Sequence, residues 1–94
     1  MAGPSTLVQS IPGTSYTMKV DTSKADCNRE PPHCHIYNIH GTRIAQVWAT
    51  SPATFASIPD GVSRRDLNAI LDTVTMFAPL IVKIYNINKV LGSD

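Results

Sequence analysis

The residues best suited to chemistry stand in one short segment, where Glu30, Pro31, Pro32, His33, Cys34 and His35 follow one another. Histidine exchanges protons near neutral pH, and a nearby carboxylate can orient its ring. Pro31 and Pro32 favour an extended backbone, so the chain is expected to enter the histidine segment in an extended conformation. Because alternate residues of a strand share a face, His33 and His35 are expected to point the same way, near Glu30. His33, His35 and Glu30 are therefore the candidate catalytic residues.

The same region also holds possible metal ligands, namely Cys27, His33, His35 and His40. Structural zinc sites usually use paired cysteines, whereas each cysteine here stands alone. Cys34 also alternates with the two histidines and should face away from them on a regular strand. A metal site made from these residues is the less favoured alternative, so the sequence predicts no metal and no cofactor. In a reducing compartment the cysteines are expected to be thiols.

Three segments before residue 50 have the period-two pattern of half-buried strands. They are residues 15–20, 33–39 and 43–49, and a glycine-containing turn at residues 38–42 joins the last two. Consecutive strands with short links predict an antiparallel meander of about three strands. Residues 50–62 are expected to form a loop, with one possible helical turn at residues 53–56.

A helix is predicted to begin after Ser63, which can cap it, with Asp66 in its first turn. Apolar residues then recur every three or four positions, at Leu67, Ile70, Leu71, Val74, Phe77 and Ile81. Pro79 removes a backbone donor and predicts a kink near it. The fold class is therefore α+β, a small antiparallel sheet covered by a C-terminal helix kinked near Pro79.

The 94 residues suffice for one domain, with residues 1–13 as a flexible lead-in and residues 14–94 as a single α+β domain. The net charge is +1, and bases and acids are interleaved, so nucleic-acid binding is not indicated. The first residues do not form a signal-peptide pattern, and no run is long enough to predict a membrane segment. A cytoplasmic location without membrane contact is expected.

The segment after Pro79 is apolar on more than one face, from Leu80 to Ile87. Either this tail packs into the domain's own core, or it forms a surface for a partner. Since twofold dimers are common, the sequence predicts a homodimer through residues 80–91.

Several motifs together resemble a family of short bacterial proteins known as domain of unknown function 4160. They are the segment from Glu30 to Ile36, then Gly41, the strand residues 45–48, and residues 61–67 at the helix start. The resemblance covers roughly residues 15 to 88. Gln46 stands where the family usually has lysine, Tyr85 lies near a usual tryptophan, and the final helix is less charged than is typical.

The resemblance implies a cytoplasmic protein encoded beside a small partner gene, in a module similar to toxin–antitoxin pairs. It implies no established reaction. The favoured hypothesis is a binding or regulatory protein of such a module, or of a mobile-element or phage-defence module, that contacts a cognate small protein. Its candidate binding residues are Pro31, Pro32, Arg43, Trp48 and Tyr85.

Two alternatives stay open beside the binding hypothesis. The first is a metal-independent ribonuclease-like toxin, in which His33 and His35 act as base and acid, Glu30 orients one of them, and Arg43 or Arg29 stabilises phosphate charge. The second is a purely structural role, with both histidines hydrogen-bonded to backbone groups.

Overall fold

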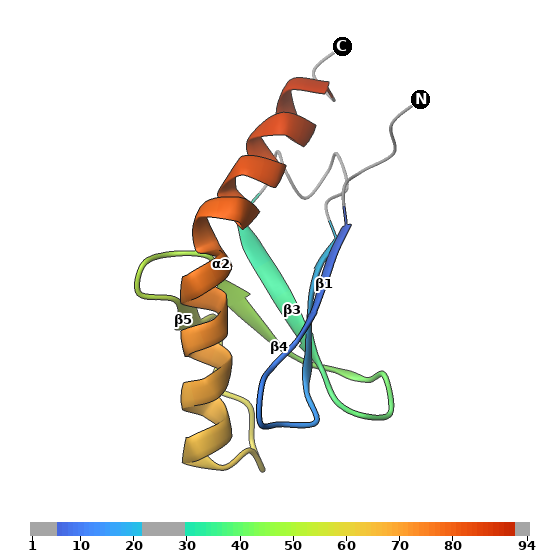
Figure 1. Cartoon of the computed structure of the whole chain (residues 1–94), viewed down its shortest axis with the longest axis vertical. Coiled ribbons are helices and arrows are strands. Elements are labelled where there is room, and N and C mark those ends of the chain that lie inside the picture. Colours follow the sequence, from blue (N-terminus) through green and yellow to red (C-terminus); the bar gives the residue numbers. More distant parts are fainter. Residues whose placement is uncertain (1–5, 22–29, 92–94) are drawn as a thin grey trace.

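The computed structural model describes residues 6–21 and 30–91, which fold as one antiparallel sheet and one long helix (Figure 1). The α+β class is therefore confirmed. The elements are β1 (Thr6–Ser10), β2 (Thr17–Asp21), β3 (His33–Tyr37), β4 (Arg43–Trp48), β5 (Thr54–Phe55) and α2 (Arg64–Leu91). Cys27 and Arg29 lie outside the described residues.

The sheet is a meander with the order β1-β2-β3-β4-β5, and all neighbouring strands are antiparallel. β2, β3 and β4 lie where the alternating pattern predicts them. The prediction of about three strands is too low, because β1 and β5 add to the sheet. The predicted helical turn at residues 53–56 is wrong, since Thr54–Phe55 pairs with β4.

β1 lies within residues 1–13, for which the sequence predicts a flexible lead-in. Pro12 and Gly13, which have the character of chain breakers, instead belong to a hairpin turn. Gly13 has a φ of 77°, and the Ile11 N–H donates to the Tyr16 carbonyl at 3.0 Å. Ile11 is buried beside this turn. The turn therefore returns the chain so that all of β1 pairs with β2.

The turn between β3 and β4 is organised by Asn38. Its backbone N–H donates to the Thr42 carbonyl at 2.9 Å, and its side-chain Oδ1 accepts from the N–H groups of His40 and Thr42. Gly41 supplies the positive φ of 80° that the turn needs. This turn brings β4 back beside β3 and so sets Trp48 opposite His33.

Helix α2 begins as the sequence predicts. The Asp66 N–H donates to Ser63 Oγ at 3.1 Å, which makes Ser63 the N-cap. The Thr75 hydroxyl links the helix to the loop before β5, because it accepts from the Ala53 N–H at 2.9 Å. The helix assignment continues through Pro79 without a break. The bend near Pro79 stays a prediction.

Helix α2 packs on one face of the sheet, and its C-terminal turns extend past the end at which β3 begins (Figure 1). The core lies between these two layers. The sheet contributes mainly Met18, Val20, Cys34, Ile36 and Val47, and the helix contributes Ile70, Val74, Ala78, Ile81 and Tyr85. We call the opposite side of the sheet the open face. On it lie Val8, Lys19, His35, Tyr37, Gln46 and Trp48, all exposed or half-buried.

Helix α2 has more apolar surface than the sheet covers. Within the described residues, one helical stretch, Arg64–Ile87, is long and apolar enough to cross a membrane, judged by length and composition only. The core helix of a soluble protein can pass the same test. However, only 28% of the most apolar part of this stretch is buried. The prediction that no run approaches transmembrane length therefore fails for this helix, and the absence of membrane contact stays a prediction.

Candidate functional site

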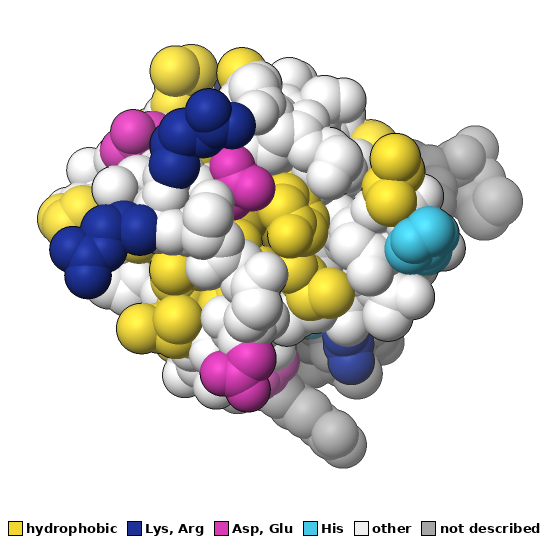
Figure 2. Space-filling model, turned by 90° about the horizontal axis from the view of Figure 1, so that it is seen from below, with side chains coloured by type: hydrophobic (Ala, Val, Ile, Leu, Met, Phe, Trp, Pro, Cys, Tyr) yellow, Lys and Arg dark blue, Asp and Glu magenta, His cyan; other side chains and the backbone are white. Residues whose placement is uncertain are grey.

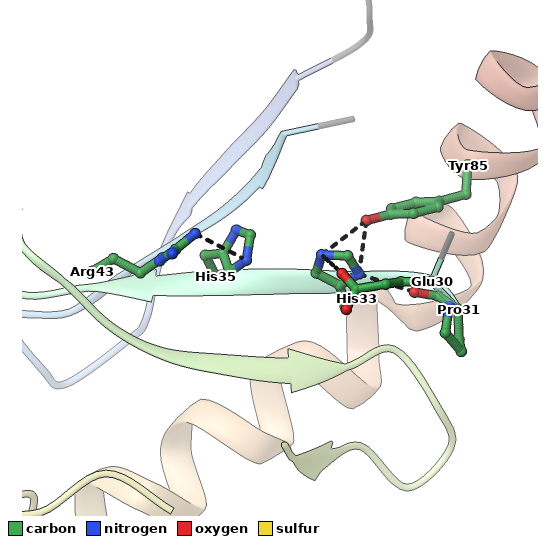
Figure 3. A network of polar contacts seen from close by, with 6 residues as sticks. All are labelled: Glu30, Pro31, His33, His35, Arg43 and Tyr85. Atoms are coloured by element: carbon green, nitrogen blue, oxygen red, sulfur yellow. Dashed lines mark hydrogen bonds and ion pairs between the residues drawn. The ribbon is translucent and has the colours of Figure 1, made fainter. Parts of the chain in front are cut away.

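His33 lies at the start of β3 and is almost completely enclosed, with 2% of its surface exposed. Its Nδ1 lies 2.9 Å from the Pro31 carbonyl oxygen (Figure 3). The Tyr85 hydroxyl reaches it from α2 and lies 3.0 Å from Nδ1 and 3.4 Å from Nε2. The Trp48 ring packs edgewise against His33 at 5.8 Å between centroids. His33 thus joins β3, β4 and the C-terminal half of α2.

These contacts fix the position of one proton on His33. A carbonyl oxygen can only accept a hydrogen bond, so Nδ1 must carry a proton and donate it to Pro31. The Glu30 carboxylate lies 3.7 Å from Nε2 and would form an ion pair with it only when the ring is charged. The predicted proximity of Glu30 to the histidines is therefore met at His33.

His35 has a different environment, although it points to the same side of β3 (Figure 3). It is half-buried, and its ring meets that of His33 edgewise at 5.1 Å. Its Nε2 lies 3.4 Å from Arg43 Nη1. An arginine guanidinium can only donate, so in this contact Nε2 must be the unprotonated acceptor. His35 thus meets Arg43 through Nε2.

Cys34 faces away from both histidines, as the alternation of the strand predicts. It is fully buried under α2, and this burial raises the pKa of its thiol to about 12. Such a thiol is neither a ready nucleophile nor a ready metal ligand. Among the described residues no three His, Cys, Asp or Glu side chains lie together as a metal site would require. Cys27, the remaining cysteine of the alternative ligand set, is outside the described residues.

The predicted binding residues do not all lie together. Tyr85 is buried at 2% exposure and contacts His33 from within. The Pro32 carbonyl accepts from the Ala49 N–H at 2.9 Å and so extends the pairing of β3 with β4, while Pro31 is exposed. Arg43 is exposed and Trp48 is half-buried, and each contacts one of the two histidines.

Sequence reasoning missed two members of this surface. Lys19 pairs in register with His35, and its Nζ lies 4.8 Å from the centre of the Tyr37 ring. Tyr37 follows His35 on the same face of β3. The alternation of β2 around Met18 was sufficient to place Lys19 on the outer side, but only the strand register shows that it lies beside His35.

Charges are mixed elsewhere on the surface. Figure 2 shows the end of the molecule at which α2 begins, where basic and acidic side chains are interspersed and apolar side chains lie between them. Arg65 and Asp66 form one such pair, at 3.8 Å. The part of the surface seen there has no broad basic patch of the kind that duplex binding uses.

Comparisons with known proteins supply no relative for this chain. No protein-family model, no curated protein and no solved structure matches it.

Proposed function

We propose that this protein is a small cytoplasmic binding or regulatory domain that contacts a cognate protein through the open face. The kind of module follows from the resemblance to domain of unknown function 4160, which stays a prediction. It would be a toxin–antitoxin-like pair, or a mobile-element or phage-defence system. The geometry supports the mode of action, that is, recognition rather than catalysis.

The burial of His33 carries this proposal. A general acid or base must come within hydrogen-bond reach of a substrate atom. His33 instead directs Nδ1 to the Pro31 carbonyl and has the Tyr85 hydroxyl within 3.4 Å of both ring nitrogens. A substrate would have to displace Tyr85, which is itself part of the core. His33 is therefore better suited to holding α2 against β3 than to moving protons.

The outward residues next to His33 have the character of a recognition surface. His35, Arg43 and Trp48 combine a hydrogen-bonding ring, a fixed cation and a large aromatic side chain on adjacent strands. Arginine and tryptophan are enriched among the residues that dominate protein interfaces.

The test is complex formation with the product of the gene adjacent to this one. We expect the two proteins to co-purify when co-expressed, and Arg43→Ala or Trp48→Ala to weaken the complex at least tenfold. His40→Ala serves as the control, because His40 is exposed in the turn beyond β3. A complex that tolerates both open-face variants, or no complex at all, would contradict the proposal.

A ribonuclease-like activity is the second candidate, and one observation favours it. The rings of His33 and His35 meet edgewise at 5.1 Å between centroids, and Arg43 lies beside His35, where it could meet a phosphate. The purified protein should then cleave a single-stranded oligoribonucleotide, and His33→Asn and His35→Asn should each abolish cleavage. We expect instead no cleavage above that of the double variant.

The proposed domain is also a homodimer through the segment 80–91. Met76, Leu80 and Ile87 lie along one side of α2 and are 75%, 42% and 45% exposed. Their spacing of four and seven residues matches the seam of a helix pair. The side chains of residues 88–91 are outside the described part of the structure.

A double variant tests the dimer. Leu80→Lys with Ile87→Lys should convert the protein to a monomer in light scattering, with its circular dichroism unchanged. Val8→Lys is the control, since Val8 is an exposed apolar residue on β1. A wild-type protein that is monomeric at high concentration, or that binds neutral phospholipid vesicles through Leu80 and Ile87, would refute the dimer.

A further inference from the structure

We propose that Lys19, His35 and Arg43 form a carboxylate-binding site on the open face, and that the partner presents an acidic side chain to it. This inference rests on the proposed function, because it specifies the chemistry of the partner at that surface.

The sheet register brings these three side chains together. Lys19 on β2 is the cross-strand neighbour of His35 on β3, and His35 is in turn the neighbour of Gln46 on β4. Side chains opposite each other in antiparallel strands have Cβ atoms about 4.5–5.5 Å apart. Arg43 reaches the same ring from the start of β4. Two cations thus flank one imidazole on a single face of the sheet.

Both cations have neutral contacts in the structure. The Lys19 ammonium lies over the Tyr37 ring, and the Arg43 guanidinium donates to the imidazole. Among residues 7–20 and 30–87, whose side chains the structure describes, no carboxylate lies within ion-pair distance of either one. Charge-assisted hydrogen bonds to a carboxylate are roughly twice as strong as neutral ones. An incoming carboxylate would therefore improve the interactions of both cations.

Arg43 is oriented for such a ligand. One of its five N–H donors is directed at His35, which restricts the plane of the guanidinium, and the remaining donors stay available for a bidentate contact. Side-chain freedom is already reduced by this contact. Less entropy is then lost when a carboxylate binds.

The surroundings favour an acidic protein segment over a single strand of nucleic acid. A strand of RNA or DNA needs exposed aromatic faces on which bases stack. The Tyr37 ring is instead covered on one side by Lys19, and Trp48 is half-buried against His33. A single carboxylate, in contrast, needs only the part of the open face that Lys19, His35 and Arg43 occupy.

The experiment titrates the full-length protein with a capped hexaglutamate peptide, followed by ¹H–¹⁵N NMR in low salt. We expect shifts at Lys19, His35 and Arg43, and none with a capped hexaglutamine peptide. Arg43→Gln and Lys19→Gln should each weaken binding about fivefold or more, and 0.2 M NaCl should weaken it further. Arg64→Gln is the matched control, since Arg64 is an exposed arginine at the opposite end of α2 from Tyr85.

Three results would overturn the site. The first is hexaglutamate binding that Lys19→Gln and Arg43→Gln leave unchanged. The second is equal binding of hexaglutamine, and the third is tighter binding of an oligouridylate through the same residues. Different results would refute the carboxylate site and the proposed function. A cognate complex that is sensitive to Trp48→Ala but not to Lys19→Gln and Arg43→Gln would refute only the carboxylate site. Hexaglutamate binding at Lys19 and Arg43 without any cognate complex would refute only the proposed function.

Discussion

His33 and His35 are the same residue type on the same side of β3, but their surroundings differ. At the start of the strand, His33 is enclosed by Pro31, Trp48 and Tyr85. Two residues later, His35 is half-buried, and its Nε2 lies 3.4 Å from Arg43 Nη1. The Tyr85 side chain of α2 contacts the ring of His33, which is buried, whereas His35 is half-buried. A repeated residue in a motif therefore need not repeat its role.

The largest expected effect separates the two histidines by stability. His33→Asn removes a buried ring and its contacts with the Tyr85 hydroxyl and the Pro31 carbonyl, so the free energy of unfolding should fall by about 2–3 kcal/mol. His35→Asn should change it by less than about 0.5 kcal/mol. Urea unfolding measures both, with His40→Asn as the exposed control. Equal losses at His33 and His35 would remove the distinction.

The next effect concerns Cys34. It stands between the two histidines in the sequence, but its side chain lies on the opposite face of β3, which α2 covers. Burial raises its pKa in the folded state from the ordinary 9.0 to about 12, so the folded state holds the thiol proton more tightly. This stabilisation is fully present below pH 9 and is lost as the pH rises toward 12, by about 1.4 kcal/mol per pH unit.

Comparison with Cys34→Ala isolates this contribution, because other groups titrate equally in both proteins. We expect the stability of the wild type to fall relative to the variant between pH 9 and pH 11 in urea unfolding. A difference that is constant across this range would mean that Cys34 is accessible to solvent.

A smaller effect tests the closure of the His33 end directly. Tyr85→Phe keeps the buried ring and removes the hydroxyl that lies near both nitrogens of His33. The free energy of unfolding should fall by about 1 kcal/mol. In the double variant with His33→Asn the two losses should not add, because they share one interaction. Additive losses would show that Tyr85 and His33 act independently.

The smallest effect on stability is expected at the open end. Arg43→Leu removes the donor to His35 Nε2 and should alter stability by less than about 0.5 kcal/mol, since the contact is exposed. It should, however, change the tautomer balance of His35, which ¹⁵N NMR of the imidazole nitrogens detects. We expect the Nδ1–H form of His33 to persist in the same spectrum, because the Pro31 carbonyl still requires it.

Local sequence pattern determined much of this fold. Strand alternation placed β2, β3 and β4, and it turned Cys34 away from the histidines. The serine before the apolar stripe placed the start of α2. These features depend on residues close in the chain, whose periods of 2 and 3.6 appear directly in the order of side chains.

Other features required the tertiary structure. β5 has only 2 residues, and the pairing of both β1 and β5 depends on neighbours brought in by turns rather than on their own pattern. The two histidines of the candidate site also differ because of contacts between distant segments. The sequence indicated that His33 and His35 share a face, but Tyr85 closes the first and lies 52 residues away. Lys19 joins the second only through the pairing of β2 with β3. Contacts between distant segments leave no periodic signal in the chain, so packing alone decided which histidine is buried and which stays half-buried on the open face.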